Sequence, residues 1–309
     1  MRLHFGFITG VAGWIGISYY EYIYGPVSVG LKVFFLVALF LSYGVNQVIN
    51  DYFGLSEDKI NAPNRPMVSG KLNPFWALLV SVFMMMALGV ISYFVSPISV
   101  LPLVAGVVLN IIYEYAKSIS LLGNIIFGLS ISTCPIYGFL LLGPKSSEIG
   151  SLNQVWVLLI LTVANGLMTY FTYFKDYEGD LKTGKRTFIV KHGPEFSAKA
   201  GIAFSLIPGA IFLLGFSFGA YSLETFGHLA LFWPCLAVTF FLQIWTAVSY
   251  YRFPTGDSTY YNLCRNIQAC VALQATVIAG FNGKLGLILL LLTYFLIKLI
   301  FNFHRDAKA

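Results

Sequence analysis

Ten apolar segments recur along the chain, and each is long enough to cross a membrane as an α-helix. The hydrocarbon core of a bilayer, about 30 Å thick, requires roughly 20 helical residues at about 1.5 Å per residue. The segments lie near residues 5–24, 29–50, 75–95, 98–116, 122–143, 153–175, 196–219, 226–250, 262–281 and 284–302. Because they are continuously apolar and do not alternate with a period of two, they predict helices and not a β-barrel. The expected fold is an all-α, polytopic transmembrane bundle around a central cavity.

The number of spans is nine or ten, because the last two segments form either two helices or one long broken helix. Of the 309 residues, 58% are hydrophobic and only 10% are charged, which is too few charges to cover a water-soluble surface. We therefore expect a single integral membrane domain over residues 1–309, with no soluble domain. The first segment lacks the small-residue cleavage site of a signal peptide, so we expect it to be retained.

The basic residues predict which side of the membrane each loop occupies, because they gather in alternate loops. They follow the second, fourth, sixth and eighth segments, at Lys59, Arg65, Lys71, Lys117, Lys175, Lys182, Lys185, Arg186, Lys191, Lys199, Arg252 and Arg265. By the positive-inside rule these loops are cytoplasmic. The net charge of +6 then reflects topology and contact with anionic membrane lipids, and no nucleic-acid partner is implied. A prokaryotic inner membrane, with the active site facing the cytoplasm, is the expected location.

Neither the cysteines nor the histidines predict a metal centre. The four cysteines lie in or beside apolar segments, where they are expected to act as small hydrophobic residues. The four histidines are scattered and share no spacing, so a His-ligated metal or haem site is not expected.

Two acidic segments follow the second and sixth apolar segments, in the long loops of the predicted cytoplasmic side. The first reads Asn46-Gln-Val-Ile-Asn50-Asp51-Tyr-Phe-Gly54-Leu-Ser-Glu57-Asp58-Lys-Ile-Asn61. In one continuous helix, Asn46, Asn50, Gly54, Glu57, Asp58 and Asn61 would share a face, whereas Asp51 would lie about 100° aside. That face would offer several oxygen ligands.

The second acidic segment combines carboxylates with basic residues. It reads Lys175-Asp176-Tyr-Glu178-Gly-Asp180-Leu-Lys182-Thr-Gly-Lys185-Arg186-Thr187, with Asp176 and Asp180 one helical turn apart. Oxygen ligands without His or Cys suit a hard cation, and the neighbouring Lys and Arg suit an anion held by that cation. Mg²⁺ bound to a diphosphate meets both requirements.

Each acidic segment taken alone is equally well explained as helix caps and a solvated loop, with Pro and Gly forming turns. Two such segments, each after an even-numbered span, favour a paired site instead. An internal duplication, with halves at about 1–120 and 121–260, would bring them face to face across the cavity. Hydropathy alone leaves that duplication open.

On these two segments the chain resembles the UbiA superfamily of intramembrane prenyltransferases. That family carries an N-D-x-x-D-x-x-x-D segment, then N-x-P-x-R-P-x-x-S-G, and later D-x-x-G-D-x-x-x-G-x-x-T. The first two patterns are matched by Asn50, Asp51, Asp58, Asn61, Pro63, Arg65, Pro66, Ser69 and Gly70. The third is matched by Asp176, Gly179, Asp180, Gly184 and Thr187. The resemblance covers most of the chain.

The resemblance implies a Mg²⁺-dependent enzyme that acts on an allylic prenyl diphosphate. The expected metal ligands are Asn50, Asp51, Glu57, Asp58, Asp176 and Asp180. Of these, Asp58, Asp176 and Asp180 are expected to be catalytic. The diphosphate is expected to contact Arg65, Tyr113, Lys117, Lys182 and Arg186. For Tyr113 and Lys117, an ordinary interfacial tyrosine and a positive-inside lysine are the alternative.

One departure from the family pattern is Gly54, which stands where the pattern has an aspartate. Glu57, one turn further on, together with Asp58 could supply the missing oxygen. This acidic pair also resembles UbiA-type terpene cyclases, so cyclisation of a prenyl diphosphate is the alternative activity.

The expected reaction moves an isoprenyl group to a lipophilic acceptor, with an aromatic compound as the first expectation. Metal and basic side chains would neutralise the leaving diphosphate, and aromatic faces would shield the carbocation. The acceptor and the prenyl chain length stay open. A membrane transporter is a further alternative, but it would need ionisable residues near mid-span, where the assigned segments hold almost none.

Overall fold

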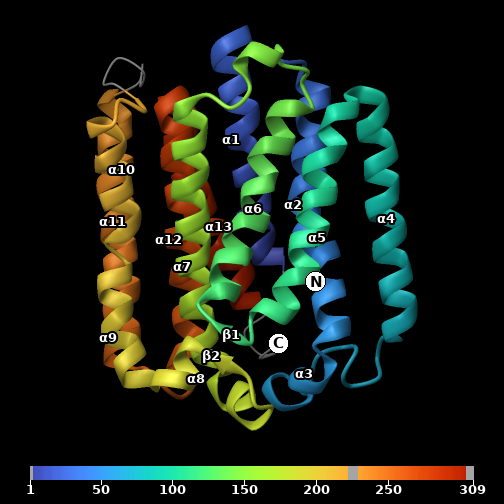
Figure 1. The fold of residues 1–309 in the computed structure, drawn as a ribbon, viewed down its shortest axis with the longest axis vertical. Coiled ribbons are helices and arrows are strands. Elements are labelled where there is room, and N and C mark those ends of the chain that lie inside the picture. The colour runs from blue at the N-terminus through green and yellow to red at the C-terminus, as the bar shows by residue number, and fades with distance from the viewer. Residues whose placement is uncertain (1–2, 222–228, 304–309) are drawn as a thin grey trace.

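The computed structural model describes residues 3–221 and 229–303, apart from the side chains of Leu3, Glu57, Asn61 and Leu229. Its long helices are α1 (Gly6–Tyr24), α2 (Val29–Phe53), α4 (Pro74–Val95), α5 (Val100–Ala116), α6 (Leu122–Leu140), α7 (Leu152–Lys182), α9 (Pro194–Phe204), α10 (Ile207–Ser217), α11 (Leu229–Arg252), α12 (Ser258–Phe281) and α13 (Gly283–Phe303). The helices stand side by side (Figure 1), so the predicted all-α bundle is confirmed.

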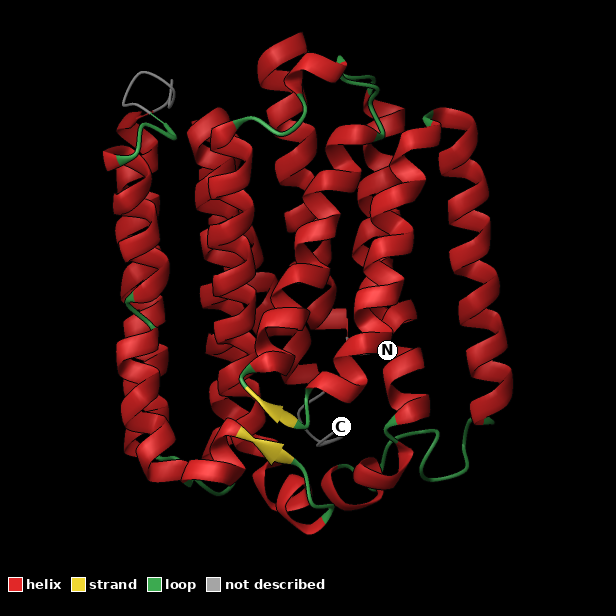
Figure 2. Ribbon diagram, in the orientation of Figure 1, coloured by secondary structure: helices red, strands yellow, loops and turns green. Residues whose placement is uncertain are grey.

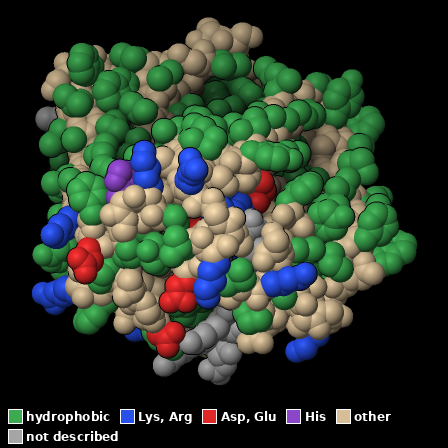
Figure 3. Space-filling model, turned by 60° about the horizontal axis from the view of Figure 1, so that its bottom comes forward, with side chains coloured by type: hydrophobic (Ala, Val, Ile, Leu, Met, Phe, Trp, Pro, Cys, Tyr) green, Lys and Arg blue, Asp and Glu red, His purple; other side chains and the backbone are tan. Residues whose placement is uncertain are grey.

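Short elements connect the long helices. They are the 3₁₀ turns η1 (Leu3–Phe5), η2 (Pro97–Ser99) and η3 (Ser146–Glu148), the helices α3 (Leu55–Asn61) and α8 (Phe188–His192), and the strands β1 (Ile119–Ser120) and β2 (Arg186–Thr187). Figure 2 shows that α3, α8 and both strands lie at one end of the bundle. We call it the motif end, because both acidic segments reach it. Figure 3 shows Lys, Arg, Asp and Glu side chains on this end and mostly hydrophobic side chains on the flanks.

Eight membrane spans within residues 3–221 and 229–303 have the length and hydropathy to cross a bilayer, with α9 and α10 together forming one of them. The helices α1 and α12 fall below that hydropathy because protein, and not lipid, surrounds them. A Cβ atom at Gly16 of α1 would lie 2.0 Å from the Pro135 carbonyl oxygen of α6, so glycine allows these two backbones to touch. With α1 and α12 included, the described helices agree with the predicted spans.

The last two apolar segments form two separate helices. α12 ends at Phe281, and α13 starts at Gly283 after the single residue Asn282. A Cβ atom at Gly286 would lie 2.4 Å from the backbone nitrogen of Ala279, which shows that α13 folds back onto α12. The structure therefore favours ten spans over nine.

Polar side chains of α12 face the neighbouring helices. Asn266 Nδ2 donates to the Met168 carbonyl of α7 at 2.7 Å, and Gln268 Nε2 donates to the Tyr294 carbonyl of α13 at 2.7 Å. Such bonds between helices satisfy groups that lipid could not. They explain how a comparatively polar helix can lie inside the bundle.

At the motif end, β1 and β2 pair in parallel, with Ile119 opposite Arg186 and Ser120 opposite Thr187. This short pairing joins the α5–α6 connection to the segment that follows α7. It places Lys117, just before β1, on the same side of the bundle as Lys185, just before β2. Two segments about 65 residues apart in sequence thereby meet beside the acidic residues.

Candidate active site

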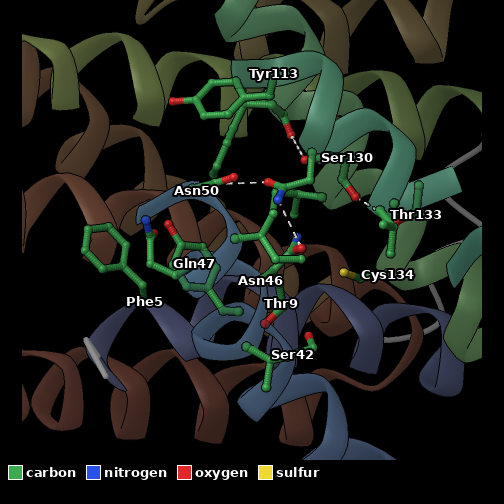
Figure 4. Close-up of a pocket in the computed structure, with 18 of the residues that line it drawn as sticks. Phe5, Thr9, Ser42, Asn46, Gln47, Asn50, Tyr113, Ser130, Thr133 and Cys134 are labelled. Atoms are coloured by element: carbon green, nitrogen blue, oxygen red, sulfur yellow. Dashed lines mark hydrogen bonds between the residues drawn. The ribbon is translucent and has the colours of Figure 1, made fainter. Parts of the chain in front are cut away.

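Both acidic segments line a single cavity of about 930 Å³, bounded mainly by α2, α4, α5, α6 and α7. Its motif end is polar and charged. Toward the opposite end its walls are mostly apolar side chains of α2, α4 and α5, such as Val37, Met85 and Leu103. Figure 4 shows the intermediate part, where Asn46, Gln47 and Asn50 project from α2 toward the cavity. One cavity therefore offers a charged end joined to a long apolar section.

The first acidic segment does not form the continuous helix that was predicted. α2 ends at Phe53, Gly54 caps it, and α3 begins at Leu55. The break at Gly54 lies between Asp51 and Asp58, and it reorients α3 relative to α2. Asp51 still lies about 100° from Asn50 around α2, yet it lines the cavity together with Asn50 and Asp58. Gln47 Nε2 donates to Asp51 Oδ1 at 2.9 Å.

Gly54 lines the cavity, and its backbone conformation does not require a glycine. Its φ of −93° and ψ of 16° are open to any residue. Glycine has no side-chain oxygen, so the carboxylate that the family pattern has at this position is missing from the cavity lining. The side chain of Glu57, which was expected to compensate, lies outside the described part of the structure.

Arg65 lies between the two carboxylates of the first segment. Its Nη1 atom is 3.1 Å from Asp51 Oδ1 and also pairs with Asp58 Oδ2. Burial alone would lower the pKa of Arg65, but the charges of Asp51 and Asp58 outweigh it and raise the pKa above its ordinary value. The guanidinium therefore stays charged and offers a planar donor fork that suits phosphate oxygens.

The second acidic segment forms the last turns of α7, which continues to Lys182. Asp176 and Asp180 are consequently one helical turn apart, as predicted, and both line the cavity. Lys175 Nζ lies 2.6 Å from Asp176 Oδ1, and Asp180 is buried. The carboxylates of the two segments thus reach one cavity from different helices.

The lysines that accompany the second segment differ from those predicted. Among the described residues, the cavity lining includes Lys175 and Lys185 but neither Lys182 nor Arg186, which are exposed. Lys182 is on the solvent side of the last turn of α7. The strand β2 then alternates its side chains, so Arg186 points outward while Thr187 is buried. Of these four basic residues, Lys175 and Lys185 line the cavity, and the predicted contact of Lys182 and Arg186 with a diphosphate stays a prediction.

Helix α5 and its C-cap contribute four further polar residues to the cavity, which are Asn110, Tyr113, Glu114 and Lys117. Tyr113 lines it and lies 3.2 Å from the Tyr173 hydroxyl of α7, measured between the two hydroxyl oxygens. Lys117 caps the end of α5 and pairs with Glu114 one turn earlier. Both predicted residues, Tyr113 and Lys117, thus lie in the cavity. Glu114 was not predicted, although its spacing from Lys117 in a helix could have indicated it.

The donor atoms of the cavity fit a hard cation bound together with an anion. Asn50, Asp51, Asp58, Asp176 and Asp180 supply oxygen atoms, and Asn50 Oδ1 is buried without a hydrogen-bond partner among the described residues. The described residues contain no group of three or more His, Cys, Asp or Glu that could hold a metal alone. Mg²⁺ commonly binds one or two carboxylates and takes its other ligands from water and substrate phosphates, so the divided carboxylates suit it.

Comparisons with known proteins agree with this geometry. The sequence profile of the UbiA prenyltransferase family matches residues 11–266. A digeranylgeranylglyceryl phosphate synthase from Thermococcus sibiricus is 30% identical over 202 residues, which are 64% of this chain and 69% of that protein. The enzyme of the same description from Pyrococcus abyssi is 29% identical over 209 residues, 67% of this chain and 72% of its own.

Solved structures share the fold. The apo structure of a UbiA homolog from Aeropyrum pernix K1 has a TM-score of 0.68 at 16% identity, covering 89% of this chain and 97% of the other. A UbiA homolog from Archaeoglobus fulgidus bound to GPP and Mg²⁺ has a TM-score of 0.61 at 15% identity, covering 94% and 95%.

Proposed function

Because the chain belongs to the UbiA prenyltransferase family, we propose that it transfers a geranylgeranyl group from its diphosphate to a hydroxyl group of a glyceryl phosphate lipid. The intramembrane prenyltransferase class follows from family membership. The donor, the acceptor and the residues that serve them are our proposal. Mg²⁺ is the cofactor, in keeping with the oxygen donors of the cavity and with the Mg²⁺-bound homolog.

The observation that supports this proposal best is the cavity itself. Its charged end is lined by five carboxylates and four cations of the described residues, which are Asp51, Asp58, Glu114, Asp176, Asp180, Arg65, Lys117, Lys175 and Lys185. Its apolar walls continue along α5 from Lys117 to Val100, a rise of about 25 Å at about 1.5 Å per residue. A diphosphate at the charged end and a long isoprenoid tail along the apolar walls fit this shape.

The proposed acceptor differs from the aromatic compound expected from the sequence. The two relatives named above are synthases of digeranylgeranylglyceryl phosphate, a glyceryl phosphate that carries two geranylgeranyl chains. A synthase of that product adds a geranylgeranyl group to a glyceryl phosphate lipid. The four cations at the motif end suit an acceptor that carries a phosphate, because hydrogen bonds from charged donors to phosphate oxygens are stronger than those from neutral donors.

In the proposed reaction, the bond between the prenyl C1 atom and the diphosphate oxygen breaks, and a bond between C1 and the acceptor oxygen forms. The acceptor hydroxyl gives up its proton to the released diphosphate, which is a base. When bound, Mg²⁺ supplies positive charge that stabilises the departing diphosphate. Arg65, Lys117, Lys175 and Lys185 donate hydrogen bonds to the same anion, and the apolar walls exclude water from the reactive carbon.

The alternatives are less well supported. Cyclisation was suggested by Gly54, but the relatives named above are synthases that build a lipid from a prenyl group and an acceptor. Transport was suggested by the similar halves, and the family is one of transferases. The protein is a multi-pass membrane protein; that its motif end faces the cytoplasm of a prokaryotic cell follows from the basic loops and stays a prediction.

A product assay tests the proposal. Protein reconstituted in lipid nanodiscs is incubated with geranylgeranyl diphosphate and Mg²⁺, and with geranylgeranylglyceryl phosphate, a hydroxybenzoate or no acceptor. We expect the doubly prenylated glyceryl phosphate by mass spectrometry in the first reaction alone. A prenylated hydroxybenzoate would replace the proposed acceptor, and a cyclic terpene without acceptor would establish cyclisation.

Lys185 is buried in the cavity wall and Arg186 is exposed, so the same substitution at the two positions should have different effects. Lys185→Gln should lower kcat/KM for the prenyl diphosphate by about tenfold to a hundredfold, because a buried charged donor is lost from the cavity. Arg186→Gln, one residue further and exposed, should change it by less than about twofold. The measurement is steady-state kinetics of both variants under the same conditions. Equal losses in the two would contradict the assignment of Lys185.

A further inference from the structure

Three asparagine side chains are linked through the cavity wall, and we call them the amide triad: Asn46, Asn110 and Asn50. Asn110 Nδ2 donates to Asn46 Oδ1 at 3.0 Å, and Asn50 Nδ2 donates to Asn110 Oδ1 at 3.1 Å. Asn46 and Asn50 lie one turn apart on α2, while Asn110 comes from α5 and is only 4% exposed. Figure 4 shows the two bonds as dashed lines that meet between Asn46 and Asn50.

The order of donors and acceptors in the amide triad fixes how Asn50 is turned. A carboxamide has an oxygen that accepts and a nitrogen that donates, and either can point into a cavity. Because Asn110 presents its oxygen to Asn50, the Asn50 nitrogen faces Asn110. The Asn50 oxygen is then directed away from Asn110 and has no hydrogen-bond partner among the described residues. Asn46 presents its oxygen to the Asn110 nitrogen, so the three amides are oriented as one set.

We propose that Asn110 is a positioning residue that holds the carboxamide oxygen of Asn50 toward the cation of the active site. The inference rests on the proposed Mg²⁺-dependent prenyl transfer. In the proposed arrangement, Asn110 does not contact the substrate. It acts through Asn50, and its own orientation depends on Asn46.

Because residue 54 is a glycine, the orientation of the Asn50 side chain matters more for binding the cation. The carboxylate that the family pattern has at this position is missing, so α2 offers the oxygen of Asn50 and the carboxylate of Asp51, which already pairs with Arg65. If Asn50 turned over, a cation would meet an NH₂ group in place of an oxygen. Hydrogen bonds in a buried, low-dielectric wall are strong enough to select one orientation, and an unpaired amide there is costly.

The amide triad also accounts for why an asparagine lies within an apolar segment of α5. Asn110 is flanked by Leu109 and Ile111, and it lies one turn from the polar residues Tyr113 and Glu114. A polar side chain at this depth needs partners from a neighbouring helix. Asn46 and Asn50, its hydrogen-bond partners in the amide triad, belong to the helix that bears the first acidic segment.

The test measures metal binding directly, with Mn²⁺ as the probe and an unreactive geranylgeranyl thiolodiphosphate as the anion. Free Mn²⁺ is followed by its EPR signal in nanodisc-embedded protein. We expect Asn110→Leu to weaken Mn²⁺ binding by about tenfold to a hundredfold, the range for residues that orient metal ligands. Asn110→Asp should bind within about threefold of wild type, because a carboxylate still accepts from Asn50 and Asn46 can turn to donate to it.

Further variants keep the test informative if Asn110→Leu does not fold. Asn46→Leu should weaken Mn²⁺ binding by several-fold, because Asn110 is then free to turn, whereas Asn46→Asp should preserve it. Asn153→Leu, the same exchange at the other end of the bundle and outside the described cavity lining, should leave binding unchanged. Excess Mg²⁺ should restore prenyl transfer in Asn110→Leu.

The outcomes separate the inference from the proposed function. Wild-type binding of Mn²⁺ by both Leu variants, or equal losses in Asn110→Leu and Asn110→Asp, would overturn the role of the amide triad while leaving the proposed function intact. If wild-type protein binds no Mn²⁺ in the presence of the thiolodiphosphate, the proposed function and this inference both fall.

Discussion

Asp176→Asn should reduce prenyl transfer by about a thousandfold, the largest loss we expect from a single substitution at the site. The asparagine keeps the size of the side chain but removes a negative charge that lines the cavity on the last turns of α7. Without that charge the cation is held less tightly, and Lys175, 2.6 Å away, loses the partner that orients it. The substitution therefore destabilises the transition state more than it destabilises the bound substrate, and the rate falls.

The measurement for Asp176 is single-turnover formation of the prenylated lipid, at Mg²⁺ concentrations from micromolar to millimolar. Glu178→Gln provides the matched control, because Glu178 lies between Asp176 and Asp180 on the same helix but is exposed. We expect that control to keep nearly full activity. If Asp176→Asn retained more than about a tenth of the wild-type rate, Asp176 would not belong to the catalytic site.

Arg65→Met should lower turnover by about a hundredfold or more while it tightens the binding of metal in the absence of substrate. In the structure Arg65 pairs with both Asp51 and Asp58. Without the guanidinium these carboxylates are left without their cation, so a divalent ion binds them more favourably. Turnover falls because the leaving diphosphate loses a planar donor that carries a permanent charge.

Two separate measurements follow Arg65→Met. Substrate-free Mn²⁺ binding by EPR should tighten, and steady-state turnover with geranylgeranyl diphosphate should drop. Lys59→Met serves as control, because Lys59 is exposed on the neighbouring helix α3 and should affect neither quantity. Wild-type turnover in Arg65→Met would show that Arg65 only neutralises the carboxylates. Weaker substrate-free Mn²⁺ binding would contradict the competition that its position indicates.

The sequence predicted the helices well because crossing lipid imposes a strong constraint. A backbone in hydrocarbon has to satisfy its own hydrogen bonds, so long apolar segments have one structural solution. The predicted segment 122–143 and helix α6, for example, differ by only a few residues at the ends. The sequence left open whether α12 and α13 are two helices or one broken helix, and the packing of α13 against α12 at Gly286 decides it.

The site was predicted less completely, for two physical reasons. The break at Gly54 places Asp58 on a separate helix, so a face assigned across both segments does not hold, and the cavity lining includes Asp51 as well as Asn50. Beyond Thr183 the chain leaves α7, and the pairing of β2 with a distant strand decides that Lys185 faces inward and Arg186 outward. Neither effect is visible in local spacing.

The internal bonds of α12 have a consequence for how the protein is made. Asn266, Gln268 and Thr276 find their partners on α7, α13 and α11, where Thr276 pairs with Thr239 at 2.8 Å between hydroxyl oxygens. A helix with this many amide and hydroxyl groups partitions poorly into lipid by itself. We therefore expect α12 to enter the bilayer together with α13, as a hairpin, and not alone. The order of translation, and not hydropathy alone, would then secure the correct topology of the C-terminal third of the protein.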